Sequence, residues 1–258
     1  MISVTERIDA LVSETRDLAK AVEGRMADRE NDPRSMCFWN IHNQTVMARE
    51  IVGLYEGAWK GEEGTEDELV DRIMSSTRNL FVNSMSSIEK GARDCMRIYG
   101  SSPVRARASE KGGRMYLRDI LEASGEVGLL DGDDMDRWRK ILMLRNLVVH
   151  NNAVSDRSEV LVLGELRISM RPERMMKGPP ATYVVLSSMA ASMFYRWMAA
   201  IDGRPRWSRR SCGTRCTAGT RGPGEAPLRY LYPAEGGRLT SDAGTARRSP
   251  LWSRRGWR

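Results

Sequence analysis

Apolar residues recur every three or four positions along about the first 200 residues of the chain. This spacing places them on one face of an α-helix. It predicts helices over 4–26, 35–59, 69–99, 115–123 and 187–201. The third of these has the most regular pattern, and at 1.5 Å per residue it is about 45 Å long. We expect the core side of the second helix to be formed by Ile41, Met47, Ile51, Val52 and Tyr55.

A different pattern follows residue 158. Val160–Leu163 and Leu166–Ser169 flank the dipeptide Gly164-Glu165. Two apolar runs joined by a two-residue connection that contains glycine are typical of a β-hairpin. Thr182–Leu186 is rich in β-branched residues and can add a third strand. We interpret residues 100–113 as a basic loop that either contacts a phosphate backbone or is simply solvated.

These patterns predict a mostly α fold, a helical bundle with a small β-hairpin insertion and a disordered C-terminal tail. We divide the chain into an N-terminal amphipathic helix (1–34), a helical domain (35–202) with the β insertion at about 158–186, and a basic tail (203–258). The tail has 13 Arg, no Lys and three acidic residues, a charge of +10. Because the whole chain carries +7, the part before the tail carries −3.

Two interpretations of the tail remain open. It lacks Ile, Val, Met and Phe and has no helical or strand period, a composition that rarely buries enough apolar surface to fold. Arginines interspersed with Trp207, Trp252 and Trp257 suit an RNA-binding arm, because they pair with phosphates and stack on bases. The abrupt loss of lysine and aliphatic residues also suits an out-of-frame or fortuitous C-terminus. We therefore draw no function from the tail.

The apolar helix that ends at His150 contains an unusual pair of polar residues. Within 141–149, only Arg145 and Asn146 are polar. A guanidinium keeps its charge and is costly to bury without a partner. Arg145 therefore needs either a phosphate ligand or a structural ion pair, for which Glu89 is the natural carboxylate, although Glu89 alone also fits a solvated boundary residue. On a helical wheel, Arg145 lies in the middle of an apolar face formed by Trp138, Ile141, Leu142, Val148 and Val149.

Asn146 and His150 lie four residues apart and share a face of this helix, with Arg145 one step round. The three side chains provide a fixed cation, an amide and a group of the only type that titrates near neutrality. Such a trio suits binding and cleaving a phosphodiester. The plainer alternative is that His150 interacts with the terminal carbonyls of its own helix.

These residues resemble the signature of the HEPN superfamily, which is an arginine, four to six residues, and a histidine, often with a polar residue directly after the arginine. Here the signature reads Arg145-Asn146-Leu147-Val148-Val149-His150 and is followed by Asn151 and Asn152. The resemblance covers residues 36–201. It implies a mostly α-helical fold that forms a homodimer and brings two motifs together. It also implies a metal-independent endoribonuclease of toxin or defence type, with RNA as substrate and a neutralising partner protein.

In the mechanism that this resemblance implies, a ribose 2′-hydroxyl attacks the adjacent phosphorus and leaves a cyclic phosphate. His150 acts as general acid or base, Arg145 stabilises charge on the phosphoryl oxygens, and Asn146 orients His150 or the substrate. Some members of the superfamily are non-catalytic RNA-binding or protein-interaction modules. We expect His150 and Arg145 to face a solvent-reachable cleft in a nuclease, and to be packed and internally paired in a module.

The rest of the sequence indicates no cofactor and no metal site, since it contains neither a glycine-rich phosphate loop nor a cluster of metal ligands. Cys37 and Cys95 fit buried free thiols, and His42 fits a helix surface. The N-terminus has no apolar signal-peptide core, and the apolar stretch 186–201 contains Arg196 and is too short to span a bilayer. We therefore expect a reduced, cytoplasmic protein that does not enter a membrane.

Two details of the His150 helix can also be predicted. Asp133 is expected to cap its start, where a carboxylate accepts a hydrogen bond from a free backbone N–H. Asn151 or Asn152 is expected to adopt the left-handed conformation that ends it.

Overall fold

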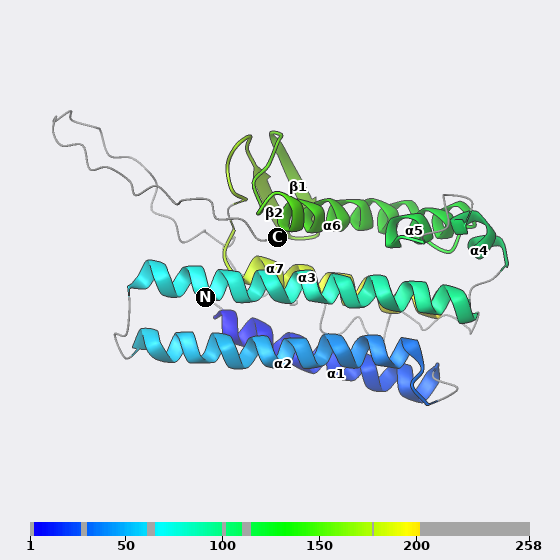
Figure 1. Cartoon of the computed structure of the whole chain (residues 1–258), viewed down its shortest axis with the longest axis horizontal. Coiled ribbons are helices and arrows are strands. Elements are labelled where there is room, and N and C mark those ends of the chain that lie inside the picture. Colours follow the sequence, from blue (N-terminus) through cyan, green and yellow to red (C-terminus); the bar gives the residue numbers. More distant parts are fainter. Residues whose placement is uncertain are drawn as a thin grey trace, which may run out of the picture. The chain divides into compact units, whose positions relative to one another are not determined.

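A computed structural model describes residues 3–26, 30–60, 65–99, 102–109, 115–176 and 178–201 of the chain. These residues form seven α-helices and one two-stranded antiparallel sheet (Figure 1). The predicted fold class, a mostly α bundle with a small hairpin, is therefore confirmed. The tail at 203–258, which we expected to be disordered, lies outside the described residues.

Four helices form the main bundle, and each packs against two neighbours in the ring order α1-α2-α3-α7. Their bounds are α1 Val4–Arg25, α2 Pro33–Lys60, α3 Glu66–Tyr99 and α7 Ala181–Ile201. Helix α7 runs parallel to α3. The ring centroids of Tyr183 and Phe81 are 6.2 Å apart, and further along both helices Phe194 contacts Gly91. Helix α2 runs in the opposite direction to its neighbours α1 and α3 (Figure 1).

The remaining elements lie on the other side of α3 and α7 from α1 and α2 (Figure 1). They are α4 Ser102–Ser109, α5 Leu117–Glu126, α6 Gly132–His150, β1 Glu159–Leu163 and β2 Leu166–Met170. Helix α6 packs on both α3 and α7, and β1 packs on α6. The strands pair from Glu159↔Met170 to Leu163↔Leu166, and Gly164 turns between them with a φ of 59°. The hairpin and its turn were predicted correctly.

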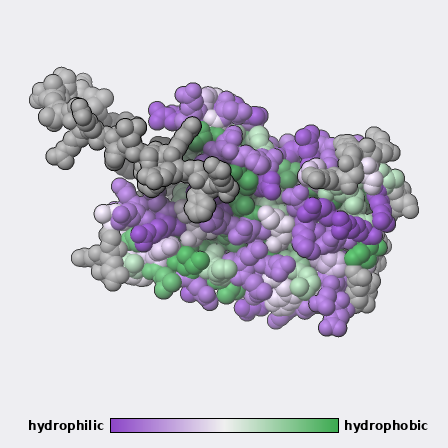
Figure 2. Space-filling model, in the orientation of Figure 1, coloured by the Kyte–Doolittle hydropathy of each residue, from purple (hydrophilic) through white to green (hydrophobic). Residues whose placement is uncertain are grey.

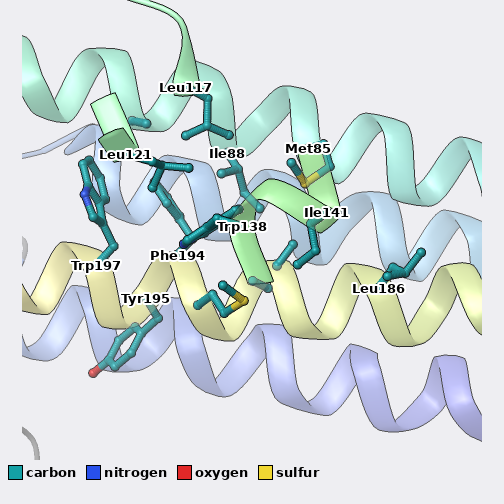
Figure 3. Packing of buried hydrophobic residues seen from close by; sticks show 14 of the residues in the cluster. Met85, Ile88, Leu117, Leu121, Trp138, Ile141, Leu186, Phe194, Tyr195 and Trp197 are labelled. Atoms are coloured by element: carbon teal, nitrogen blue, oxygen red, sulfur yellow. The ribbon is translucent and has the colours of Figure 1, made fainter. Parts of the chain in front are cut away.

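The core is rich in aromatic side chains where α6 crosses α7. Trp138 of α6 lies beside Phe194 of α7, and Leu121 of α5 and Ile88 of α3 belong to the same cluster (Figure 3). The rings of Phe194 and Trp197 are stacked, with their centroids 5.3 Å apart. Side chains of this size each bury about 150–250 Å², so this cluster fixes α6 firmly on the bundle.

A buried ion pair lies at one end of the bundle. Arg34 Nη2 lies 2.8 Å from Asp32 Oδ2, and Tyr99 donates a hydrogen bond to the same oxygen at 2.7 Å. The guanidinium also lies 3.7 Å from the centroid of the Tyr99 ring and donates to the carbonyl of Met26. These contacts tie the turn between α1 and α2 to the end of α3.

Two local predictions were wrong in the same way, because helix replaced irregular or extended structure. Part of the predicted basic loop, 102–109, forms α4, in which Pro103 occupies the first turn, where its missing N–H costs nothing. The predicted third strand at Thr182–Leu186 is instead the start of α7. Tyr183 and Val184 are buried there against the bundle, and this packing outweighs their local preference for strand.

Two side chains of α2 are placed differently from their predictions. His42 is buried against α1, with Nδ1 3.3 Å from Thr15 Oγ1, and its ring packs edge-on to Trp39. Met47 was predicted in the core, but more than half of its surface is exposed. The face of the molecule in Figure 2 is mainly hydrophilic with small hydrophobic patches, so single exposed apolar residues of this kind are ordinary.

Helix α7 has the length and hydropathy of a membrane-spanning segment by composition alone. Within the bundle it serves as a core helix. Its apolar side chains pack against α3, α1 and α6.

Candidate functional site

The helix that carries the Arg-Asn-His motif begins at a well-formed cap. Asp131 is the N-cap, and its carboxylate accepts a hydrogen bond of 2.7 Å from the backbone N–H of Asp134. The predicted cap, Asp133, instead lies in the first turn, where it and Asp134 complement the positive end of the helix dipole. Asp134 also accepts a hydrogen bond of 3.0 Å from Arg196 of α7, so the start of α6 is anchored to the bundle.

The helix ends sharply after His150. Asn151 is the C-cap, and Asn152 adopts a φ of 49°, as predicted for one of these two residues. Ala153 follows with a φ of 64° and is fully buried. Two successive residues with left-handed backbone conformations reverse the direction of the chain. The Ser155 hydroxyl then stabilises the reversed segment, because it accepts a hydrogen bond from the backbone N–H of Arg157 and donates one to the backbone carbonyl of Arg157.

This reversal creates a solvent-open cleft of about 430 Å³ beside α6. One wall is a stripe of α6 in which Arg139, Met143, Asn146 and His150 follow at helical spacing. The other walls come from α5, from the segment after α6 and from β2. They are formed by Arg118, Glu122, Asn151, Ser155, Asp156, Arg157 and Met170. His150 and Asn146 are both exposed there, and the imidazole of His150 makes no hydrogen bond within the described part of the chain.

Arg145 lies elsewhere. It is five residues from His150, which is about 140° round the helix, and it does not line the cleft. Its Nη2 lies 3.7 Å from Glu89 Oε2 of α3, and its Nη1 donates a hydrogen bond of 3.0 Å to Asn146 Oδ1. The side chains of Arg145 and Glu89 are 25% and 22% exposed, so the pair sits at the boundary of the core. Asn146 therefore connects Arg145 to the cleft.

The predicted apolar face of α6 is only partly confirmed. Trp138, Ile141 and Val148 are buried as expected, but Arg145 lies at the edge of the core and 40% of Val149 is exposed. Leu144 and Leu147 are buried as well. Helices α3, α5 and α7 and the hairpin cover α6 from more than one side, which is why its buried face is wider than one stripe.

Three arginines line the cleft, and they differ in their partners. Arg118 Nε donates to Glu122 Oε1 at 2.8 Å, and Arg157 Nε donates to Asp156 Oδ1 at 3.0 Å. Arg139 has no hydrogen-bond or ion-pair partner among the described residues. The cleft thus combines cations, an amide and an imidazole over a floor of Leu142, Met143, Leu147 and Met170, a combination that suits a phosphate with an attached apolar or aromatic group.

The two cysteines of the helical body have a different environment. Cys37 and Cys95 are buried free thiols, as predicted. Burial raises the pKa of Cys37 well above its usual value and that of Cys95 to about 12. Both thiols are therefore protonated near neutrality and are poor nucleophiles. Among the described residues no group of three His, Cys, Asp or Glu side chains could hold a metal ion.

No protein-family model, no curated protein and no solved structure significantly matches this chain.

Sequence reasoning identified His150 and Asn146, which lie together in the cleft, and named Glu89 as the partner of Arg145 in the alternative of a structural ion pair. It did not identify Arg118, Arg139 or Arg157. The repeat of polar residues at 139, 146 and 150 along one helix face was a signal for Arg139. Arg118 and Arg157 reach the cleft only through the packing of α5 and the reversal after His150, which no local pattern predicts.

Proposed function

We propose that this chain is a metal-independent endoribonuclease of the HEPN type, acting as a cytoplasmic homodimer in a toxin or defence system with a neutralising partner protein. The observation that carries the proposal is the placement of His150 and Asn146 in one solvent-open cleft with three arginines. A phosphodiester requires a proton-transfer group and cations for its charged oxygens, and these side chains supply both.

In the proposed reaction, the ribose 2′-hydroxyl loses its proton as its oxygen bonds to the adjacent phosphorus. The bond from phosphorus to the 5′-oxygen breaks, and that oxygen takes up a proton. The products are a 2′,3′-cyclic phosphate and a 5′-hydroxyl. His150 transfers one of these protons as general acid or base. Cationic side chains stabilise the charge that develops on the phosphoryl oxygens.

The role of Asn146 follows from its contacts. Its Oδ1 accepts a hydrogen bond from Arg145, which leaves its amide N–H groups as donors toward the cleft. We expect Asn146 to contact the substrate or His150, and Arg145 to act as a positioning residue that holds this amide. The motif predicts a direct contact between Arg145 and the phosphate. Because Arg145 is paired with Glu89 in the structure, this contact would require the ion pair to break.

The second candidate is a non-catalytic helical module that binds RNA or protein. The specific observation that favours it is the internal pairing of Arg145 with Glu89 and Asn146 outside the cleft. The exposure of His150 to solvent therefore supports the nuclease, whereas the pairing of Arg145 supports the module.

Cleavage of single-stranded RNA by the full chain distinguishes the candidates. We expect wild-type protein to cleave RNA in EDTA and to leave 2′,3′-cyclic ends, because the proposed chemistry uses only side chains. His150→Ala is expected to reduce the rate by about 10²–10⁴-fold, the usual contribution of general acid–base catalysis. Arg137→Ala, an exposed residue of the same helix that does not line the cleft, is the control and is expected to retain full activity.

Cleavage that depends on added metal, or equal activity of wild type and His150→Ala, contradicts the nuclease proposal. Absence of any cleavage by purified wild-type protein favours the module.

A further inference from the structure

The cleft extends well beyond His150, and its far end contains a cation with no assigned partner. Arg139 is exposed and lies on the same stripe of α6 as Asn146 and His150, eleven residues before the histidine. At 1.5 Å per residue, the two Cα positions are about 16 Å apart along the helix axis. One phosphodiester at His150 therefore leaves Arg139 without a ligand.

The other two arginines of the cleft have carboxylate partners. Arg118 is bound to Glu122 and Arg157 to Asp156, so a ligand must compete with a carboxylate for either of them. Arg139 has no such competitor in the part of the chain that the structure describes. A guanidinium in this state presents its planar set of N–H donors to an incoming anion, and phosphate is well matched to it.

We propose that Arg139 forms a second phosphate subsite, so that a single RNA strand lies along α6 from His150 toward Arg139. This inference rests on the proposed function, because it names the substrate that the same cleft takes. A stacked strand advances about 3.4 Å per nucleotide, so 16 Å corresponds to about five steps.

The apolar floor between the two ends supports this path. Leu142 and Met143 are only partly buried and line the cleft between Arg139 and Asn146. Apolar side chains at this position contact the flat faces of bases without distinguishing one base from another. The subsite therefore reads the length and charge of the strand and not its sequence.

The test compares a dinucleotide with a hexanucleotide of RNA as substrates for the full chain. We expect Arg139→Gln to lower kcat/KM for the hexanucleotide by about ten- to a hundredfold, the usual effect of losing one charge-assisted hydrogen bond. Cleavage of the dinucleotide, which has a single phosphate, is expected to stay unchanged. Arg139→Lys is expected to restore part of the loss. Arg137→Gln, an exposed arginine of the same helix that does not line the cleft, is the matched control.

A binding arm keeps this inference separable from the nuclease proposal. The probe is a 2′-deoxy hexanucleotide, which lacks the attacking hydroxyl, and its affinity is measured over a range of salt concentrations. We expect Arg139→Gln to lower the slope of log K against log salt by about 0.7, the value for one phosphate contact with a single strand. All variants carry the same basic tail, so its contribution cancels in the comparison.

These results separate the two proposals. If the salt slope is the same in Arg139→Gln and wild type, the subsite is wrong whether or not the chain cleaves RNA. If the chain cleaves no RNA but the salt slope falls in Arg139→Gln, the nuclease proposal fails and the subsite stands. If the chain cleaves RNA and Arg139→Gln affects both substrates equally or neither, the subsite is wrong and the nuclease stands. If a nucleoside monophosphate binds in an Arg139-dependent way and the oligonucleotide does not, the cleft takes a free nucleotide and the proposed path is overturned.

Discussion

Arg145 and Glu89 face each other between α6 and α3, with Nη2 3.7 Å from Oε2. The distance is that of an ion pair without a direct hydrogen bond. The same guanidinium donates to Asn146 on its other side, so it joins a carboxylate of the bundle to an amide of the cleft. Stability of α6 on α3 and the geometry of the cleft are therefore linked through one side chain.

The Arg145–Glu89 pair predicts a small but measurable coupling. Both side chains are about a quarter exposed, so solvent reduces their attraction, and we expect a coupling free energy below about 1 kcal/mol. Arg145→Ala is expected to destabilise the fold by about 1 kcal/mol, because it leaves the Glu89 carboxylate without its partner. Urea unfolding of Arg145→Ala, Glu89→Gln and the double variant measures the coupling. His150→Ala, at an exposed helix end, is expected to change stability by less than about 0.5 kcal/mol.

Strictly additive effects of the two substitutions would show that the pair does not interact in solution. In that case Arg145 is free to enter the cleft, and the direct phosphate contact expected from the motif becomes the better interpretation.

Periodicity was sufficient for most of the fold and for only part of the site. The hairpin was predictable because Gly164 supplies the φ above zero that a two-residue turn needs, and it lies between two short apolar runs. The start of α7, Thr182–Leu186, was not, because Tyr183 and Val184 favour strand locally and only their burial in the bundle makes them helical. Arg145 was misplaced for a similar reason, since several tertiary partners, rather than one apolar face, decide which side of α6 is buried.

The Asp32–Arg34 pair predicts a stability that depends on pH. Burial alone raises the pKa of Asp32, but hydrogen bonds from Arg34 and Tyr99 and the charge of Arg34 outweigh it and lower the pKa below its ordinary value. The folded state thus favours the ionised carboxylate. Its contribution is complete above the unfolded pKa, which is about 4, and is lost as pH falls toward the lower folded pKa.

We therefore expect Asp32→Asn to destabilise the protein by about 3 kcal/mol or more at pH 7, because it removes the charge that pairs with the buried Arg34. The difference from wild type is expected to shrink when unfolding is measured at pH 3. Asp94→Asn is the control, since Asp94 pairs with the exposed Lys90 and should cost less than about 1 kcal/mol. A difference between Asp32→Asn and wild type that stays constant with pH would contradict the assignment.

Gly91 predicts a packing effect in α3. A Cβ at this position would lie 2.8 Å from both Cβ and Sγ of Cys37 and 3.4 Å from Cζ of Phe194. Alanine normally favours a helix over glycine by about 1 kcal/mol. Here we expect Gly91→Ala to destabilise the protein instead, by about 1–3 kcal/mol, because α2 and α3 must move apart. Thermal unfolding measures the change.

Gly57→Ala provides the matched control, since nothing lies within 4 Å of a Cβ added there in α2. It is expected to be stabilising by up to about 1 kcal/mol. If both substitutions stabilise the fold, the close approach of α2 and α3 at Cys37 is not present in solution.

The proposed homodimer predicts activity that depends on protein concentration. The sequence suggested a second copy because α6 is apolar on opposite sides, but this chain itself buries Leu144, Leu147 and Val148. The remaining support is the resemblance of the motif to a superfamily that brings two copies together, and three valines exposed on α6 and β1, namely Val149, Val160 and Val162. Light scattering of the full chain at micromolar concentration is expected to give twice the chain mass.

If the site is composite, the specific activity should fall on dilution, because dissociation separates the two motifs. A monomeric mass together with a specific activity that does not change on dilution would mean that one copy of the cleft is sufficient, and the second motif would then have no part in cleavage.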